Sequence, residues 1–179
     1  MQQKQTPKEK TARALTPELR RRIILLGVKI LGILLIFYIL LFRIYGFVRI
    51  NTNMMMPSVK GGDLALVYHI AGDYAIGDIV EYRCENRTCF GRIIAKEGDE
   101  INLKEGKILI NGHLEDTASY GDNIFPEGGS VSYPYKVASE QYFIVGDNRN
   151  EYDDSRSFGA INKSEIVSKI IGVFRTHDI

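Results

Sequence analysis

An uninterrupted apolar stretch near the N-terminus places the strongest constraint on how this chain folds. Residues 23–42 read IILLGVKILGILLIFYILLF and are apolar or glycine apart from Lys29 and Tyr38. About twenty helical residues cross the hydrocarbon core of a bilayer, whereas a core helix of this length is expected to carry a polar face. The stretch therefore predicts a transmembrane helix. Pro17, a residue type tolerated at the first helical position, marks where a helix can begin.

A cleaved signal peptide is the nearest alternative, but its apolar region should be shorter and end in small residues. Here the run leads into LFRIYGFVRIN, which offers no small-x-small cleavage site. Lys29 lies two turns into the run, and its ammonium group can reach back to the near interface. We expect an uncleaved single-span anchor.

The residues before the apolar run are basic, which predicts the topology. Residues 1–22 are the tail, and positive flanks stay in the cytoplasm. We therefore expect a cytoplasmic tail over 1–22, a plasma-membrane helix over 23–42 and an extracellular domain over 43–179. The tail's basic residues, set against only Glu9 and Glu18, are Lys4, Lys8, Lys10, Arg13, Arg20, Arg21 and Arg22.

The whole chain has a formal net charge of +1. Phosphate binding needs a concentrated basic surface, so no nucleic-acid partner is expected. Two cysteines and three scattered histidines do not predict a metal site, and we expect no cofactor. Cys84 and Cys89 flank a four-residue turn; they either form a disulfide, as an oxidising compartment would favour, or remain free thiols.

The region after the apolar run has the composition typical of β-strands. Short segments rich in Val, Ile, Tyr and Phe are bounded by Gly, Asp and Asn; they cover 63–70, 78–84, 89–97, 107–112 and 141–147. Asn111-Gly112 predicts a hairpin turn, and 162–171 suits either a helix or a short helix leading into a strand. Residues 115–134 predict a long polar loop. The expected fold is a mainly β, antiparallel domain, closed or partly closed into a barrel-like form.

Four short polar boxes follow the apolar run, and they carry a family resemblance. They are MMMPS (54–58), GDIVEY (77–82), GRIIAKEGDEI (91–101) and GDNRNEYDDSRSFG (146–159). In order and spacing the boxes resemble those of type I signal peptidases, in their Gram-positive form. That family cleaves secretory signal peptides with a Ser–Lys dyad, so the resemblance implies a signal-peptidase-like β domain behind a membrane anchor.

Three positions depart from the family pattern, and all three belong to its catalytic unit. The resemblance places Met54 at the nucleophilic serine, Gly91 at the general-base lysine and Tyr152 at the serine that orients the lysine. A thioether has no proton to lose and glycine supplies no base. Removing a nucleophile or base from comparable hydrolases lowers the rate on the order of a millionfold. The chain is therefore predicted to be a pseudoenzyme with no catalytic residues.

The residues around the missing dyad still fit the family. Thr52 stands where the family keeps an oxyanion-hole hydroxyl. The positions that match the family's structural motifs are Met55, Pro57, Ser58, Arg92, Ile93, Ile94, Gly146, Asp147, Asn148, Arg149, Asp154, Ser155 and Arg156. Restoring Met54→Ser, Gly91→Lys and Tyr152→Ser is accordingly expected to rebuild the dyad geometry.

A rewired serine-type endopeptidase, still cleaving preproteins, is the alternative. Ser58 and Ser155 are better explained as structural hydroxyls. Lys96 would lie about 16 Å along the strand from Gly91 and on its opposite face. Cys89, if free, is the one credible substitute nucleophile.

A site without a dyad can still hold an extended peptide, because β-addition uses backbone hydrogen bonds and side-chain pockets. The candidate peptide or partner groove comprises Thr52, Met54, Met55, Met56, Pro57 and Gly91. The methionine run has three interpretations: it fills the vacated pocket, contacts membrane lipid, or contacts the ligand.

The resemblance extends to non-catalytic signal-peptidase-like proteins of the SipA type, which assist pilus assembly in Gram-positive cocci. It implies a chaperone-like role in pilin polymerisation, with pilin subunits and a pilus sortase as partners. A third possibility is a regulatory copy that competes with an active signal peptidase for preproteins.

Overall fold

The structure is a computed structural model, and it describes residues 16–175 except 71, 85–86 and 116–129. Helix α1 runs from Pro17 to Ile44 and includes the predicted span with additional turns at its N-terminal end. It has the length and composition to cross a membrane, and none of its residues is buried. The chain divides into two compact units, residues 1–41 and 42–179.

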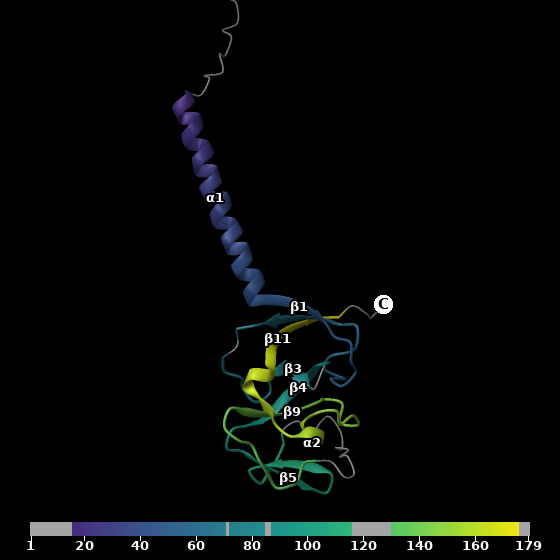
Figure 1. Cartoon of the computed structure of the whole chain (residues 1–179). Helices are drawn as coiled ribbons and strands as arrows, with labels where there is room; N and C mark the ends of the chain where they lie inside the picture. The colour runs from purple at the N-terminus through teal and green to yellow at the C-terminus, as the bar shows by residue number, and fades with distance from the viewer. Residues whose placement is uncertain (1–15, 71, 85–86, 116–129, 176–179) are drawn as a thin grey trace, which may run out of the picture. The chain divides into compact units, whose positions relative to one another are not determined.

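The second unit consists of two antiparallel sheets. The larger has seven strands in the order β1-β2-β11-β3-β4-β9-β10, and the smaller has four in the order β7-β6-β5-β8. Within this unit β1 lies at one end and β5 at the other (Figure 1). The strands are β1 (Tyr45–Arg49), β2 (Leu64–Tyr68), β3 (Ile79–Cys84), β4 (Arg87–Lys96), β5 (Glu100–Lys104), β6 (Lys107–Ile110), β7 (His113–Leu114), β8 (Tyr135–Lys136), β9 (Gln141–Val145), β10 (Ile161–Asn162) and β11 (Ile166–Phe174); α2 (Ser155–Phe158) and the 3-10 turn η2 (Lys163–Glu165) complete the fold.

The mainly β, antiparallel expectation is confirmed, but the domain is not a closed barrel. Strands β1 and β10 end the strand order of the larger sheet, and the described residues show no pairing between them. A barrel closes only when its first and last strands pair with the required stagger. The long connection after β4 instead forms a second sheet, β5 to β8, so the larger sheet stays open.

Local signals in the sequence correspond to individual turns and strands. Asn111 and Gly112 adopt positive φ angles of 51° and 81° and connect β6 to β7, as the hairpin signal predicts. Residues 163–165 form one short turn, and strand β11 follows directly, as the 162–171 pattern indicates. Strands β1, β5, β7 and β8 lie outside the predicted segments. Their short runs are exposed or only partly buried, which weakens the hydrophobic pattern.

The core comprises three clusters of buried side chains. One lies around Tyr82 and Ile144, a second around Met55 and Phe90, and a third around Phe143 and Ile101. Strand β4 contributes to all three, because residues on both of its faces are buried. The strand carrying the box at 91–101 is thus held from both sides, which fixes the position of Gly91.

Candidate functional site

Met54 lies in the turn between β1 and β2 and is held by main-chain contacts. Its N–H donates to the Thr52 hydroxyl at 3.2 Å, and its carbonyl accepts from the Asn148 N–H at 2.8 Å. Met54 and Met55 are 6% and 0% exposed, whereas Met56 is 38% exposed. Burial of the first two favours the interpretation that they fill space in the domain. Met56 is left with surface to present to a lipid or a ligand.

Gly91 lies in β4 where a side chain has no room. A Cβ atom added at Gly91 would lie 2.5 Å from Ile144 Cγ2, and 3.4 Å from both a Tyr82 ring carbon and the Val145 carbonyl oxygen. Ile144 and Tyr82 are fully buried, so neither can readily move aside. The space that a general base would need at this position is therefore filled. The three-residue restoration expected from the sequence meets an obstacle at Ile144.

The Tyr82 hydroxyl is buried without a hydrogen-bond partner among the described residues. Burial raises the pKa of Tyr82, and the nearby Asp154 and Asp153 carboxylates raise it further. The phenol therefore stays neutral in the folded chain at ordinary pH and does not replace the missing base.

Tyr152 lies at the surface, with its side chain 44% exposed, and the pocket beside Met54 is lined by other residues. The Tyr152 carbonyl accepts a hydrogen bond from the Ser157 hydroxyl. The structure thus joins Met54 to the Asn148 loop but leaves the Tyr152 ring at the surface.

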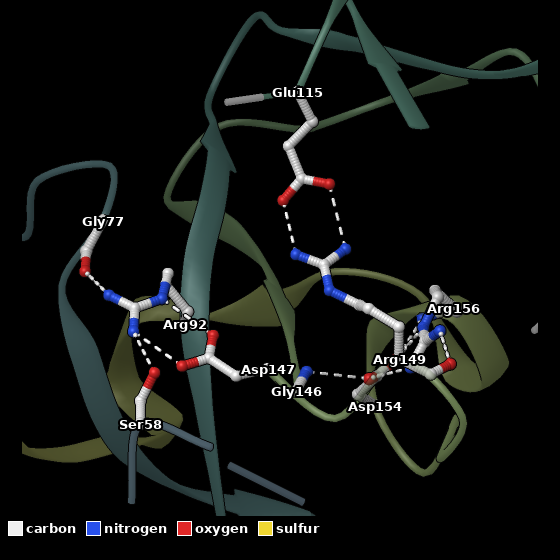
Figure 2. A network of polar contacts seen from close by, with 9 residues as sticks. All are labelled: Ser58, Gly77, Arg92, Glu115, Gly146, Asp147, Arg149, Asp154 and Arg156. Atoms are coloured by element: carbon white, nitrogen blue, oxygen red, sulfur yellow. Dashed lines mark hydrogen bonds and ion pairs between the residues drawn. The ribbon is translucent and has the colours of Figure 1, made fainter. Parts of the chain in front are cut away.

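Two of the family's motifs are linked by a charged pair (Figure 2). Arg92 donates from Nε to Asp147 Oδ1 at 2.8 Å and from Nη2 to Oδ2 at 2.6 Å. The same guanidinium reaches the Gly77 carbonyl at 2.7 Å and the Ser58 hydroxyl at 3.5 Å. A bidentate Arg–carboxylate pair fixes orientation as well as distance, so the boxes around residues 58, 77, 92 and 147 form one scaffold.

A second pair braces the loop that contacts Met54. Arg156 donates to both carboxylate oxygens of Asp154, at 2.9 and 2.8 Å, and both residues are almost fully buried. Asp154 also accepts from the Gly146 N–H at 2.9 Å. Ser155 accepts from the Ile144 N–H at 3.0 Å. The structural role expected of this motif follows from these contacts.

A third pair has no counterpart in the sequence patterns. Arg149 donates to Glu115 through Nη1 at 2.9 Å and Nη2 at 2.6 Å, with side chains 2% and 6% exposed (Figure 2). Glu115 begins the polar loop predicted over 115–134, and most of that segment, 116–129, lies outside the described residues. No local signal marks a glutamate whose partner is 34 positions away, because the pairing depends on the tertiary fold.

A pocket of about 410 Å³ opens beside Met54, and we call it the Met54 pocket. One wall is the turn at Asn51, Thr52 and Met54, and the other is the start of β4, at Arg87, Thr88 and Cys89. Strand β4 pairs with β3 from Arg87 to Arg92 but with β9 only from Arg92 onward. Among the described residues, the β9 side of the segment 87–91 has no strand partner. The exposed start of this unpaired segment, Arg87 and Thr88, borders the pocket, whereas residues 89–91 are buried.

None of the three nucleophiles considered from the sequence, Cys89, Ser155 and Ser58, is placed to attack a substrate. Cys89 is joined to Cys84 in a disulfide, with Cα atoms 5.9 Å apart. Ser155 is fully buried, and the Ser58 hydroxyl lies against Arg92. A disulfide sulfur is not the thiolate that nucleophilic attack requires. The rewired peptidase thus finds no support in the geometry.

Lys96 is exposed at the far end of β4, beyond an irregularity in the strand. The register of β4 against β9 shifts between Ile93 and Ala95. A bulge of this kind adds a residue and breaks the alternation of faces. Lys96 therefore cannot be assigned to the face opposite Gly91 by counting residues.

Comparison with known proteins places this geometry in a family. The family model described as signal peptidase, peptidase S26, matches residues 22–174. The chain belongs to the signal peptidase family, whose members are membrane-anchored peptidases, and α1 is its candidate membrane span.

Individual relatives make the placement more specific. Inactive signal peptidase IA of Staphylococcus aureus (strain MRSA252) is 31% identical over 149 residues, covering 79% of this chain and 84% of the relative. Signal peptidase IB of S. aureus (strain COL) is 24% identical over 155 residues, covering 74% and 81%. A crystal structure of a signal peptidase I from Enterococcus faecalis V583 is similar with a TM-score of 0.46 and 22% identity, covering 56% of this chain and 97% of that one. The relatives named inactive support an inactive, signal-peptidase-like protein.

Proposed function

We propose that this chain is a non-catalytic membrane protein that binds an extended peptide segment and assists pilus assembly. The observation that carries the proposal is the edge of β4 at residues 87–91, which lacks a β9 partner among the described residues and borders the Met54 pocket. The position of a nucleophile holds Met54, and the space for a base is filled by Ile144. The site therefore keeps the means to hold a strand and lacks the means to cut it.

Peptide binding by strand addition fits this arrangement physically. An unpaired edge offers backbone N–H and C=O groups, which supply affinity without side-chain chemistry. Ordinary proteins cover or charge such edges because they attract other strands. Here the edge faces a cavity of about 410 Å³, large enough for side chains of a bound segment.

The pilus role rests on the resemblance to SipA-type proteins. In this proposal the N-terminus lies in the cytoplasm, the helix spans the plasma membrane and the β domain is extracellular. The ligand is then a segment of a pilin subunit, presented near the membrane to a pilus sortase. The chain acts as a chaperone in this step.

The catalytic part is tested by incubating the full chain, in detergent micelles, with a labelled preprotein. An active signal peptidase serves as the positive control. We expect the preprotein to remain intact. Cleavage at a rate close to that of the control enzyme would show that a rewired site exists.

The binding part is tested on the same sample with a fluorescent strand-forming peptide and fluorescence anisotropy. The control peptide carries alternate prolines, which remove backbone donors and prevent pairing. We expect saturable binding of the first peptide and none of the second. Equal signals from both peptides would exclude strand addition.

The cellular part is tested by deleting the gene and separating surface polymers by size. We expect the ladder of pilin polymers to collapse to monomer while preprotein processing is unchanged. Unchanged ladders together with altered secretion would instead favour the copy that competes with an active signal peptidase.

A further inference from the structure

The lining of the Met54 pocket is largely polar. Among the described lining residues, Asn51, Thr52, Thr88 and Arg87 carry hydrogen-bonding groups. Met54 and Cys89 supply the apolar remainder. Three neutral polar side chains and one cation converge on the cavity, and no carboxylate is among these lining residues.

Arg87 is the charged member of the lining, and its side chain is largely exposed. It forms an ion pair with Asp153, and the two side chains are 56% and 40% exposed. Exposed ion pairs contribute little because water competes for both charges. The guanidinium has five N–H donors, so a second carboxylate can join or replace Asp153 with little loss of free energy. Arg87 also lies on the open part of β4, where a bound strand would pass.

We propose that the Met54 pocket selects an acidic side chain, Asp or Glu, on the bound extended peptide. The carboxylate is held by Arg87, with hydrogen bonds from the Thr52 and Thr88 hydroxyls, while the peptide backbone pairs with β4. This inference rests on the proposed peptide-binding function and specifies its ligand. It predicts that the pocket prefers acidic side chains to small apolar ones.

The test uses a host peptide of alternating threonine and valine, acetylated, amidated and fluorescently labelled, with one central variable residue. Asp, Glu, Gln, Ala and Lys are placed at that position, and binding to the full chain in detergent micelles is measured by anisotropy. We expect the Asp and Glu peptides to bind about tenfold more tightly than the Gln and Ala peptides, a difference of about 1.4 kcal/mol. The preference should shrink as salt is raised, because exposed charges are screened.

Variants assign the preference to the pocket. Arg87→Gln should remove the preference for acid while leaving the Ala peptide unaffected. Asp153→Asn removes the competing carboxylate and should tighten the Asp peptide several-fold. Arg83→Gln is the matched control: Arg83 lies opposite Thr88 on β3 but lines a separate pocket, so the same loss of charge should leave the preference intact.

The outcomes separate this inference from the proposed function. If no host peptide binds, both fail together. If all peptides bind and Ala equals or exceeds Asp, the acidic preference is wrong and peptide binding stands. If the preference survives in the Arg87→Gln/Asp153→Asn double variant, or is lost in Arg83→Gln as well, the pocket is not its source and the inference is overturned.

Discussion

Gly91→Ala tests directly whether the base position is closed. At a strand position with room for a methyl group, alanine is expected to stabilise a protein by about 0.5–1 kcal/mol relative to glycine. Here the new Cβ would lie 2.5 Å from Ile144 Cγ2, closer than carbon atoms pack. Overpacking of this kind lowers stability by about 1–3 kcal/mol, so the expected sign is reversed. Gly91→Lys adds the burial of an ammonium group, which lowers stability by several kcal/mol more.

The assay is urea unfolding of the full chain in detergent micelles. Circular dichroism and tyrosine emission report the β domain, since the chain has ten tyrosines and no tryptophan. Gly172→Ala is the control, because a Cβ there meets only Leu66 at 3.9 Å; it should be neutral or stabilising. Ile144→Leu, which removes the β-branch at similar volume, should relieve Gly91→Ala by about 1 kcal/mol in a double-mutant cycle. A Gly91→Ala variant as stable as Gly172→Ala would refute the reasoning.

Three further predictions concern buried polar groups and the disulfide. Glu115→Ala should lower the free energy of unfolding by about 3–5 kcal/mol, because it leaves the Arg149 charge buried. The double variant Glu115→Leu/Arg149→Met should recover most of this loss in the same urea assay. A loss under about 1 kcal/mol in Glu115→Ala would show that the pair is solvated. Tyr82→Phe should leave stability unchanged or raise it by about 1 kcal/mol, because an unpartnered hydroxyl is removed. The folded-state pKa of Tyr82 lies above the unfolded value, so wild-type stability should fall as pH rises above about 10; the Phe variant should show a shallower fall, and identical pH curves would contradict the assigned cause. Replacing Cys84 and Cys89 by serine should lower stability by about 2 kcal/mol from the loop-closure term, and the effect should vanish when wild type is compared under reducing conditions.

The extent to which sequence predicts this fold differs between elements. The apolar run fixes α1 because its composition admits few alternatives. The Asn111-Gly112 turn follows from local backbone preference, which needs no tertiary information. Of the two forms expected, full closure into a barrel does not occur, because closure depends on how the edge strands β1 and β10 are placed, and no short pattern encodes that placement.

The site shows the same division between motif and geometry. The resemblance identifies Met54 and Gly91 as degenerate positions without any coordinates. It cannot show that Ile144 fills the space at Gly91, since that contact depends on the register of β4 against β9. Because of the bulge near Ile93, the face on which later residues of β4 lie cannot be derived from their spacing in the sequence. Arg87 is a further case, because only the open edge of β4 gives it a role.

The main-chain bond between Asn148 and Met54 has a practical consequence. The Asn148 N–H binds the Met54 carbonyl, and a Cβ at Gly146 would lie 2.7 Å from that same oxygen. The position of the backbone at residue 54 is therefore set by main-chain contacts and does not depend on the Met54 side chain. That makes the position a suitable place to install a reporter: a photo-crosslinking or environment-sensitive amino acid at 54 would sit on the pocket wall and record, in living cells, which segment arrives there and when it leaves.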